Sequence, residues 1–358
     1  MRSDPLPAAE GGVQIAPAPG WHARLERAEE PVGAARGDTW ARRLLGPLHV
    51  TGVFWLRAIM WVARGSNLRA VSMVWLWSTI FFFLLRRPRR IVADHLAVVL
   101  GPCNWFARQL RIFRAFKDHA WCLVERFEQF RPDFRPRVDV LGEWHQLDRT
   151  RGFIVCTAHV GLWEMGQLMP VVDGGRRLHV VREREEHERT HEIVADLLAK
   201  HPHARIVTHW LDEDAQLGAT LLTALRKGDA VTLAGDRAKA GMAALRATMF
   251  GRPVQLPAGP PALARAAEVP IVPCFVFRVG RRHYRVVARQ PFTVARTADR
   301  HADLQAAAER LAAEFEWAVR QNPYQWKRWE PVWPRATVES ARRGAEQQAA
   351  AHGSGQAS

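Results

Sequence analysis

The 358-residue chain has little cysteine, little lysine and, over its middle part, no serine. No serine occurs between Ser78 and Ser340, which excludes a catalytic triad with a serine nucleophile from that stretch. The four cysteines are widely spaced and form no C-x-x-C pair, which argues against a disulfide framework or zinc knuckle and favours a reducing compartment. Neither G-x-x-x-x-G-K-[ST] nor a strand-linked G-x-G-x-x-G occurs, so the sequence offers no familiar nucleotide phosphate site.

The abundant residues are arginine and tryptophan. Lysine contributes only five of the 51 basic residues, the formal net charge is +15, and there are 15 tryptophans. A positive chain favours an anionic partner, and tryptophan together with arginine suits a membrane interface with anionic headgroups. Nucleic acid binding is an alternative that the charge alone permits. The basic residues are spread along the chain without an aromatic–basic binding motif, so we expect no nucleic acid partner.

Two apolar segments with basic flanks lie near the amino terminus. Ala70–Leu85 has 16 residues without a charge, fewer than the roughly 20 that a comfortable membrane span needs. Val50–Ala63 is apolar and aromatic with one arginine. The pair predicts a helical hairpin that enters one leaflet or lies at its surface. A buried pair of core helices and a single membrane span remain alternatives, and two further helices are expected within residues 88–130.

From about residue 131 on, short β-branched segments alternate with helical patterns. This alternation predicts an α/β fold with a central mixed, mostly parallel sheet flanked by helices and preceded by membrane-associated helices. We expect a disordered leader without a secretory signal (1–48), an apolar and basic helical region (49–130), the α/β domain (131–334) and a disordered tail (335–358). The predicted strands are Val138–Leu141, Phe153–Thr157, Leu178–Val181, Ile206–Thr208, Ala230–Leu233, Ile271–Val276 and Tyr284–Ala288. The predicted helices lie near 160–170, 188–200, 214–227, 260–268 and 300–321.

His159 is the strongest candidate for catalysis. It directly follows an apolar strand, where parallel sheets place ligands and chemistry, and Glu164 follows it at H-x4-E spacing. If a helix begins here, Glu164 lies one turn on and can reach back to the imidazole. That contact would fix the tautomer and leave the other ring nitrogen to take a proton from a hydroxyl. A purely structural His–Glu pair that caps a helix is the alternative.

Two other motifs are less convincing. Cys156 precedes His159 by three residues on a strand, so the two side chains would point to opposite faces, and we expect a buried core cysteine. His187 to His191 spell H-E-x-x-H, a zinc pattern, but the surrounding residues are almost all charged and no third ligand stands at a recognisable spacing. We expect a charged helix start and no metal, with a zinc hydrolase as a distant alternative.

At the His159 motif the sequence resembles the lysophospholipid acyltransferase superfamily, and in particular its bacterial lipid A late-acyltransferase branch. The similarity extends over residues 50–333 as an ordered set of blocks. Besides the H-x4-[DE] block, it includes VVRERE, LLTALRKGDAVTLAGDRAKAG, the long block that begins MFGRP, and NPYQWKRWEPVW. The sequence departs from the branch around Arg182, which lacks its usual tyrosine and proline neighbours, and after Asp236, where a second aspartate is absent.

The resemblance implies roles for individual residues. His159 would be the general base and Glu164 its orienting carboxylate. Arg182, Arg205, Asp236, Arg237 and Gly251 would be substrate-binding residues. The arginines would meet acceptor phosphates or the thioester oxygen, and Asp236 would organise Arg237 or the acceptor site. No cofactor or metal is implied.

The resemblance also implies a reaction and its partners. A fatty acyl thioester, on acyl carrier protein or coenzyme A, would donate its acyl group to a hydroxyl of a lipid A-like membrane glycolipid. The enzyme would work against the membrane surface at the cytoplasmic face of the bacterial inner membrane. An acyltransferase of another lysolipid or of a specialised lipid pathway is the alternative within the superfamily.

Overall fold

The computed structural model describes residues 26–27, 53–142, 151–164, 176–199, 205–211 and 216–333. Its centre is a seven-stranded sheet with the order β2-β10-β9-β3-β6-β4-β5. All neighbouring strands are parallel except β9 and β10, which form an antiparallel hairpin. The strands are β2 (Arg137–Gly142), β3 (Phe153–Thr157), β4 (Leu178–Arg182), β5 (Ile206–Trp210), β6 (Ala230–Ala234), β9 (Ile271–Gly280) and β10 (His283–Ala288). The predicted mixed, mostly parallel α/β sheet is confirmed.

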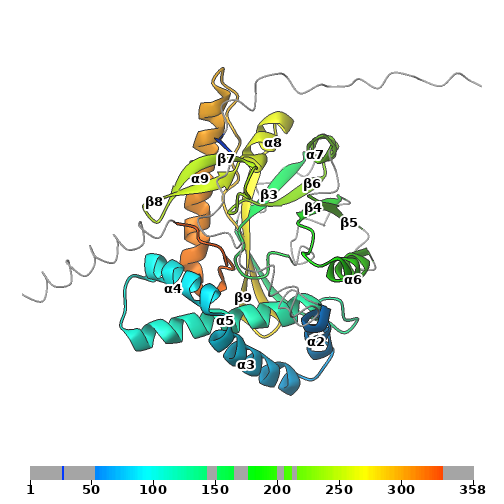
Figure 1. Ribbon diagram of the computed structural model, residues 1–358. Helices are drawn as coiled ribbons and strands as arrows, with labels where there is room; N and C mark the ends of the chain where they lie inside the picture. Colours follow the sequence, from blue (N-terminus) through cyan, green and yellow to red (C-terminus); the bar gives the residue numbers. More distant parts are fainter. Residues whose placement is uncertain are drawn as a thin grey trace, which may run out of the picture.

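Helices cover both faces of this sheet (Figure 1). The carboxyl-terminal helix α9 and the short α8 lie on one face, while α5 crosses the other side near the amino-terminal helices. The helices after β3 are α6 (Glu188–Ala199), α7 (Leu217–Arg226), α8 (Gly259–Ala267) and α9 (Arg300–Gln321), followed by the 3-10 turn η6 (Pro323–Gln325). Each of the four α-helices was predicted, and the helix expected near 160–170 is treated with the site below.

A small second sheet was not predicted. Its hairpin consists of β7 (Ala243–Met249) and β8 (Arg252–Pro257), and β7 also pairs with β1 (Glu26–Arg27). Apart from β1, the expected leader lies outside the described residues, as does the whole of the expected tail. Alternate residues of β7 are buried, so its pattern is that of a half-buried strand. The hairpin lies against α9 and adds a third layer beyond the sheet and its helices (Figure 1).

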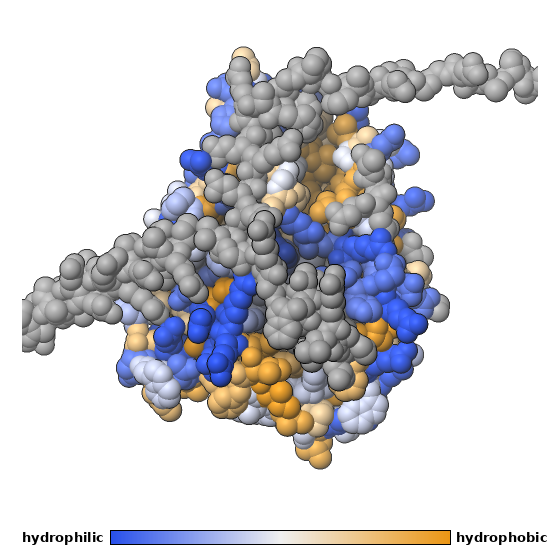
Figure 2. All heavy atoms as spheres, viewed as in Figure 1, coloured by the Kyte–Doolittle hydropathy of each residue, from blue (hydrophilic) through white to orange (hydrophobic). Residues whose placement is uncertain are grey.

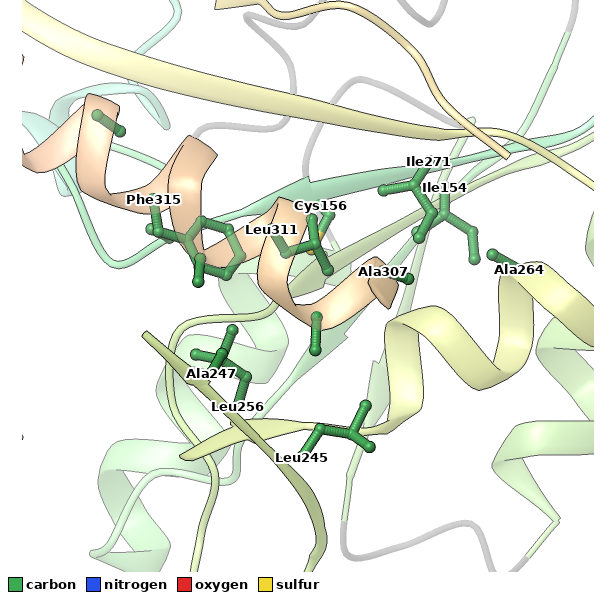
Figure 3. Packing of buried hydrophobic residues seen from close by; sticks show 14 of the residues in the cluster. Ile154, Cys156, Leu245, Ala247, Leu256, Ala264, Ile271, Ala307, Leu311 and Phe315 are labelled. Atoms are coloured by element: carbon green, nitrogen blue, oxygen red, sulfur yellow. The ribbon is translucent and has the colours of Figure 1, made fainter. Parts of the chain in front are cut away.

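The core between α9, α8, the β7–β8 hairpin and the central sheet is tightly packed (Figure 3). Cys156 of β3 lies in this core with no exposed surface, beside Phe315 of α9. Burial raises the pKa of the Cys156 thiol far above its ordinary value, so the side chain remains a neutral thiol. The prediction that Cys156 is a core residue is confirmed.

The amino-terminal helices are α2 (Val53–Ala63), α3 (Asn67–Leu84), α4 (Arg86–Leu100) and α5 (Trp105–Glu128), as the sequence predicts. Ser66 and Asn104 cap α3 and α5 by accepting hydrogen bonds from backbone N–H groups of the first turn. Within the described part of the chain, α3 is the helix long and apolar enough to cross a membrane, judged by length and composition alone. Only 22% of it is buried in the protein.

Candidate active site

The loop that follows β3 carries His159 and is held by backbone hydrogen bonds to two other segments. Gly161 N donates to Gln325 O (3.0 Å), and Leu162 N donates to Val276 O (2.9 Å). Gly161 has a φ of 64°, and a Cβ there would lie 2.0 Å from the Val276 carbonyl oxygen, so only glycine fits. The loop is thereby fixed at the carboxyl-terminal edge of the parallel strands.

His159 is paired with Asp236, which comes from the next strand in the sheet. Asp236 follows β6, and β6 lies beside β3, so the two residues meet at one edge although 77 positions separate them. Oδ1 of Asp236 accepts from His159 Nδ1 (2.6 Å) and from the His159 backbone N–H (3.1 Å). Because a carboxylate can only accept, Nδ1 carries the proton and Nε2 of the neutral ring presents a lone pair. The His159 side chain is 15% exposed.

Asp236 is buried and surrounded by donors. Its Oδ2 accepts from the indole Nε1 of Trp326 (3.1 Å), and its backbone carbonyl accepts from the Arg328 guanidinium. Burial alone raises the pKa of a carboxyl. Here it is outweighed by the charge that the His159 ring carries when it is protonated, by the hydrogen bond from that ring, by the Arg328 charge and by the Trp326 hydrogen bond. The pKa of Asp236 is therefore well below its usual range, and the carboxylate stays ionised.

Contrary to the prediction, Glu164 forms no hydrogen bond or ion pair with the His159 ring. Residues 160–164 form a bridge and a turn instead of the first turn of a helix, so the geometry that would bring Glu164 back to His159 is absent, and residues 165–170 lie outside the described ones. Glu164 instead binds Arg126 Nε of α5 (2.6 Å) and lies 3.4 Å from Arg182 Nη2 at the end of β4. Asp236 takes the place on the imidazole that the sequence analysis gave to Glu164.

The Glu164 cluster consists of Glu164, Arg126, Arg182 and Glu185. Its side chains are largely buried and their charges compensate one another. Arg126 also binds Glu185 (2.9 Å), so two guanidinium groups face two carboxylates. Burial would raise the pKa of Glu164, but the charges of Arg126, Arg182 and Lys327, with His159, lower it below its ordinary value. Arg182 thus lies at the same edge of the sheet as His159, in a cluster that includes Glu164.

Arg237 lies next to this site but is not organised by Asp236. Its guanidinium binds Glu330 (2.6 Å) and lies 3.7 Å from Glu183, which Lys239 also approaches (3.4 Å). These ion pairs connect the loop after β6 with the end of β4 and with the carboxyl-terminal segment. Arg237 is about one-third exposed, so it can meet a ligand from solvent.

A family model for bacterial lipid A biosynthesis acyltransferases matches residues 78–333 of this chain. The protein belongs to this acyltransferase family. It is therefore an acyltransferase of lipid A biosynthesis, with an acyl donor and a lipid A-like acceptor. A comparison with curated proteins finds no match.

Two further residues of this acyltransferase, Arg205 and Gly251, were predicted to bind substrate. Arg205 precedes β5 and is exposed, so it stands at the amino-terminal edge of the parallel strands, opposite His159. Its assignment rested on spacing within a sequence block, which does not distinguish the two ends of a strand. Gly251 forms the β7–β8 turn with Phe250, and their φ angles of 68° and 53° match a type I′ hairpin turn. A Cβ at Gly251 would meet nothing within 4 Å, so its requirement is conformational.

The H-E-x-x-H segment of the acyltransferase does not form a wholly solvated helix start. Helix α6 begins at Glu188, which binds Arg184, while His191 is buried with its ring 4.5 Å from that of Trp210. The helix start is charged and exposed at Glu188 and Arg189, as expected, but it is not wholly solvated, because Thr190 and His191 are buried. Among the described residues, no group of three or more potential metal-binding side chains is found.

The contributions of α5 and of the carboxyl-terminal segment to the site were not predicted from the sequence. Arg126 stands on α5 among many other arginines, so its type carried no signal. Trp326 and Arg328 belong to the NPYQWKRWEPVW block, which signalled the resemblance but not a contact with Asp236. Such contacts depend on packing between elements that are distant in sequence, and no local pattern reports them.

Proposed function

We propose that the protein transfers a fatty acyl group from a thioester, on acyl carrier protein or coenzyme A, to a hydroxyl of a lipid A-like glycolipid at the cytoplasmic face of the bacterial inner membrane. The observation that carries the proposal is the His159–Asp236 pair at the carboxyl-terminal edge of the parallel strands. A ring nitrogen that is free to accept a proton, held by a buried carboxylate, suits direct attack by an alcohol.

The chemistry is a single acyl transfer with a balanced proton. The acceptor oxygen attacks the thioester carbonyl carbon while His159 Nε2 takes the hydroxyl proton. The tetrahedral intermediate then collapses, the C–S bond breaks, and the imidazolium returns the proton to the leaving sulfur. Asp236 stabilises the imidazolium and holds the tautomer, in the role that the sequence analysis gave to Glu164. Neither a serine nor a cysteine nucleophile is needed.

Stabilisation of the thioester oxyanion falls to a side chain. The backbone N–H groups of His159 to Leu162 already donate to Asp236, Ala158, Gln325 and Val276. A backbone oxyanion hole in this loop would require those bonds to break. The guanidinium groups of the Glu164 cluster supply positive charge beside the base, and Glu164 positions them. Arg237 is placed to meet a phosphate of the acceptor.

An exposed apolar face on the amino-terminal helices supports the membrane location. Orange side chains gather at the lower end of the molecule, over α3 (Figure 2). The large exposed apolar residues of α2, α3 and α5 are Phe54, Trp61, Leu68, Val71, Trp75, Leu76, Ile80, Phe83, Leu84, Trp105, Phe106 and Leu110. Exposed arginines at the start of α4 adjoin this face. Such a surface fits an interface with anionic lipid, and positive charge also favours encounter with an acidic carrier protein.

The decisive experiment is mass spectrometry of membrane lipids from cells with and without the gene. We expect one glycolipid species to become lighter by a single acyl group when the gene is removed. Wild-type protein should restore it, and a His159→Ala protein, expressed at the same level, should not. Restoration by His159→Ala would contradict the base, while a changed phospholipid with unchanged glycolipids would favour the alternative lysolipid acyltransferase.

A further inference from the structure

The segment Gln325–Arg328 contacts the His159–Asp236 pair through both its main chain and its side chains. Val160 and Trp326 form an isolated antiparallel bridge, and Lys327 N donates to His159 O (2.7 Å). The main chain of this segment is therefore fixed to the same loop that carries the base. Gln325 strengthens the attachment, because its side chain bonds both the backbone N–H and the carbonyl of Arg278 in β9.

The indole of Trp326 completes a closed circuit of contacts. His159 binds Oδ1 of Asp236, Trp326 binds Oδ2, and the backbone of Trp326 returns to the residue after His159. A carboxylate anchored at one oxygen can turn about its Cβ–Cγ bond, whereas anchoring both oxygens fixes its plane. The plane of Asp236 in turn sets the direction of the imidazole and of Nε2.

The indole is itself held firmly. Trp326 is 8% exposed, and its ring packs against those of His95 (5.2 Å) and Trp333 (5.9 Å). Trp333 is 3% exposed, but no acceptor among the described residues lies within hydrogen-bond distance of its Nε1. The two tryptophans thus share one cluster and a similar burial, and differ in whether the N–H has a partner.

We propose that Trp326 is a positioning residue of the acyl transfer, which acts through Asp236 by fixing the plane of its carboxylate. The inference rests on the proposed role of His159 as base. It assigns to the indole N–H a function that packing alone does not require. A ring of similar shape without that N–H should therefore preserve the fold and impair the base.

The test compares Trp326→Phe with the matched control Trp333→Phe in the full-length protein. Activity is measured as transfer from myristoyl acyl carrier protein to total membrane lipid of cells that lack the gene. We expect Trp326→Phe to lower kcat by about 10- to 100-fold, the range for losing one hydrogen bond to a charged group, with KM within about twofold. Trp333→Phe should keep kcat within about threefold of wild type.

A second readout is independent of activity. In protein labelled with ¹⁵N-histidine, the Nδ1 proton of His159 should resonate far downfield and be identified by its loss in His159→Ala. We expect this signal to move or broaden in Trp326→Phe and to persist in Trp333→Phe. An unchanged signal, with equal kcat in the two variants, would overturn the proposal. If the signal is altered in Trp326→Phe but the wild-type protein transfers no acyl group, the result instead contradicts the proposed function.

If Trp326→Phe does not fold, the unaltered tryptophans provide the measurement. One of the fifteen indole N–H signals should be protected from solvent exchange in wild type and lose that protection in Asp236→Ala. Unchanged protection of every indole signal would overturn the proposal.

Discussion

Tryptophan is used in opposite ways in two regions of this molecule. On the amino-terminal helices, Trp75 and Trp105 are 50% and 73% exposed, whereas Trp326 and Trp333 of the carboxyl-terminal segment are 8% and 3% exposed. The first pair presents apolar surface to the outside, and the second packs behind the His159–Asp236 pair. On the proposed function, the same residue type serves the membrane face in one region and, through Trp326, the geometry of the base in the other.

Membrane binding and the positioning of the His159–Asp236 pair thus fall on different residues and should be separable. The exposed helices present apolar surface. The segment 322–333 instead makes polar contacts with the His159–Asp236 pair, from Trp326 to the carboxylate and from Lys327 and Arg328 to backbone carbonyls. Variants on each side should damage one task and spare the other.

The largest effect is expected for Asp236→Asn. The amide cannot stabilise an imidazolium as a carboxylate does and can impose the wrong tautomer, so kcat should fall by about 10²–10⁴-fold. Steady-state transfer assays and vesicle co-sedimentation, done on the same preparation, give both readouts. Vesicle binding should equal that of wild type, and Glu164→Gln, which leaves the Asp236–His159 contact in place, should lower kcat less. A larger loss in Glu164→Gln would reverse the roles assigned to the two carboxylates.

The second effect is on the pH dependence of folding stability. It arises at His95, where the amino-terminal helices contact the carboxyl-terminal segment. His95 of α4 accepts a hydrogen bond from the Val332 backbone N–H, and burial, with the Arg328 charge, lowers its pKa to about 3. The unfolded chain binds a proton on this residue near pH 6.5 and the folded protein does not. Stability should therefore fall as the pH drops from about 6.5 towards 3, by about 2 kcal/mol at pH 5 from His95 alone.

Urea unfolding of wild type and His95→Gln at pH 7.5 and pH 5 measures this effect. Glutamine retains an acceptor and does not titrate, so the variant should lose less stability on acidification. The exposed His301→Gln serves as control and should keep the wild-type pH dependence. Parallel losses in all three proteins would show that His95 is not kept neutral by the fold.

The third effect is on membrane binding. Phe83 of α3 and Phe106 of α5 are 68% and 71% exposed, and replacing both by serine removes apolar surface from the proposed membrane face. We expect about tenfold weaker binding to vesicles of anionic lipid, with unchanged kcat on detergent-dispersed substrate. The control replaces Val140 and Leu141 by threonine. These residues are 46% and 49% exposed and belong to the edge strand β2 instead of to the amino-terminal helices. Equal loss of binding in both double variants would remove the membrane face.

The smallest effect is expected for Arg205→Ala. Because Arg205 stands at the amino-terminal edge of the sheet, kcat and KM should stay within about twofold of wild type. Arg182→Ala, at the opposite edge, is the informative contrast and should impair transfer. A substantial loss in Arg205→Ala alone would show that the acceptor reaches around the sheet.

The elements of the fold were largely predictable because their signals are local. Two elements can be recognised from their own residues alone: the apolar, β-branched strand Phe153–Thr157 and the periodic helix Arg300–Gln321. The β7–β8 hairpin was not predicted, because its turn is Phe250-Gly251 instead of the usual Asn-Gly or Asp-Gly. The residue types therefore gave no sign of the positive φ angles that the turn requires.

The site was only partly predictable because its contacts are not local. His159 was located from its place after a strand. The choice of Glu164 as its partner followed from proximity in sequence and from a helix that does not begin there. The partner found, Asp236, is reached through the adjacency of β3 and β6, and strand order cannot be read from a single strand.

The bond from the Lys327 amide to the His159 carbonyl has a consequence for biosynthesis. Helices α2 to α5 leave the ribosome first, whereas residues 325–328 emerge after every strand of the central sheet. On the proposed function, a growing chain reaches the lipid surface long before the loop that carries the base has all of its contacts. Translation that stops short of this segment then yields a product that binds the membrane but lacks the contacts that hold the base, so that activity requires a nearly complete chain.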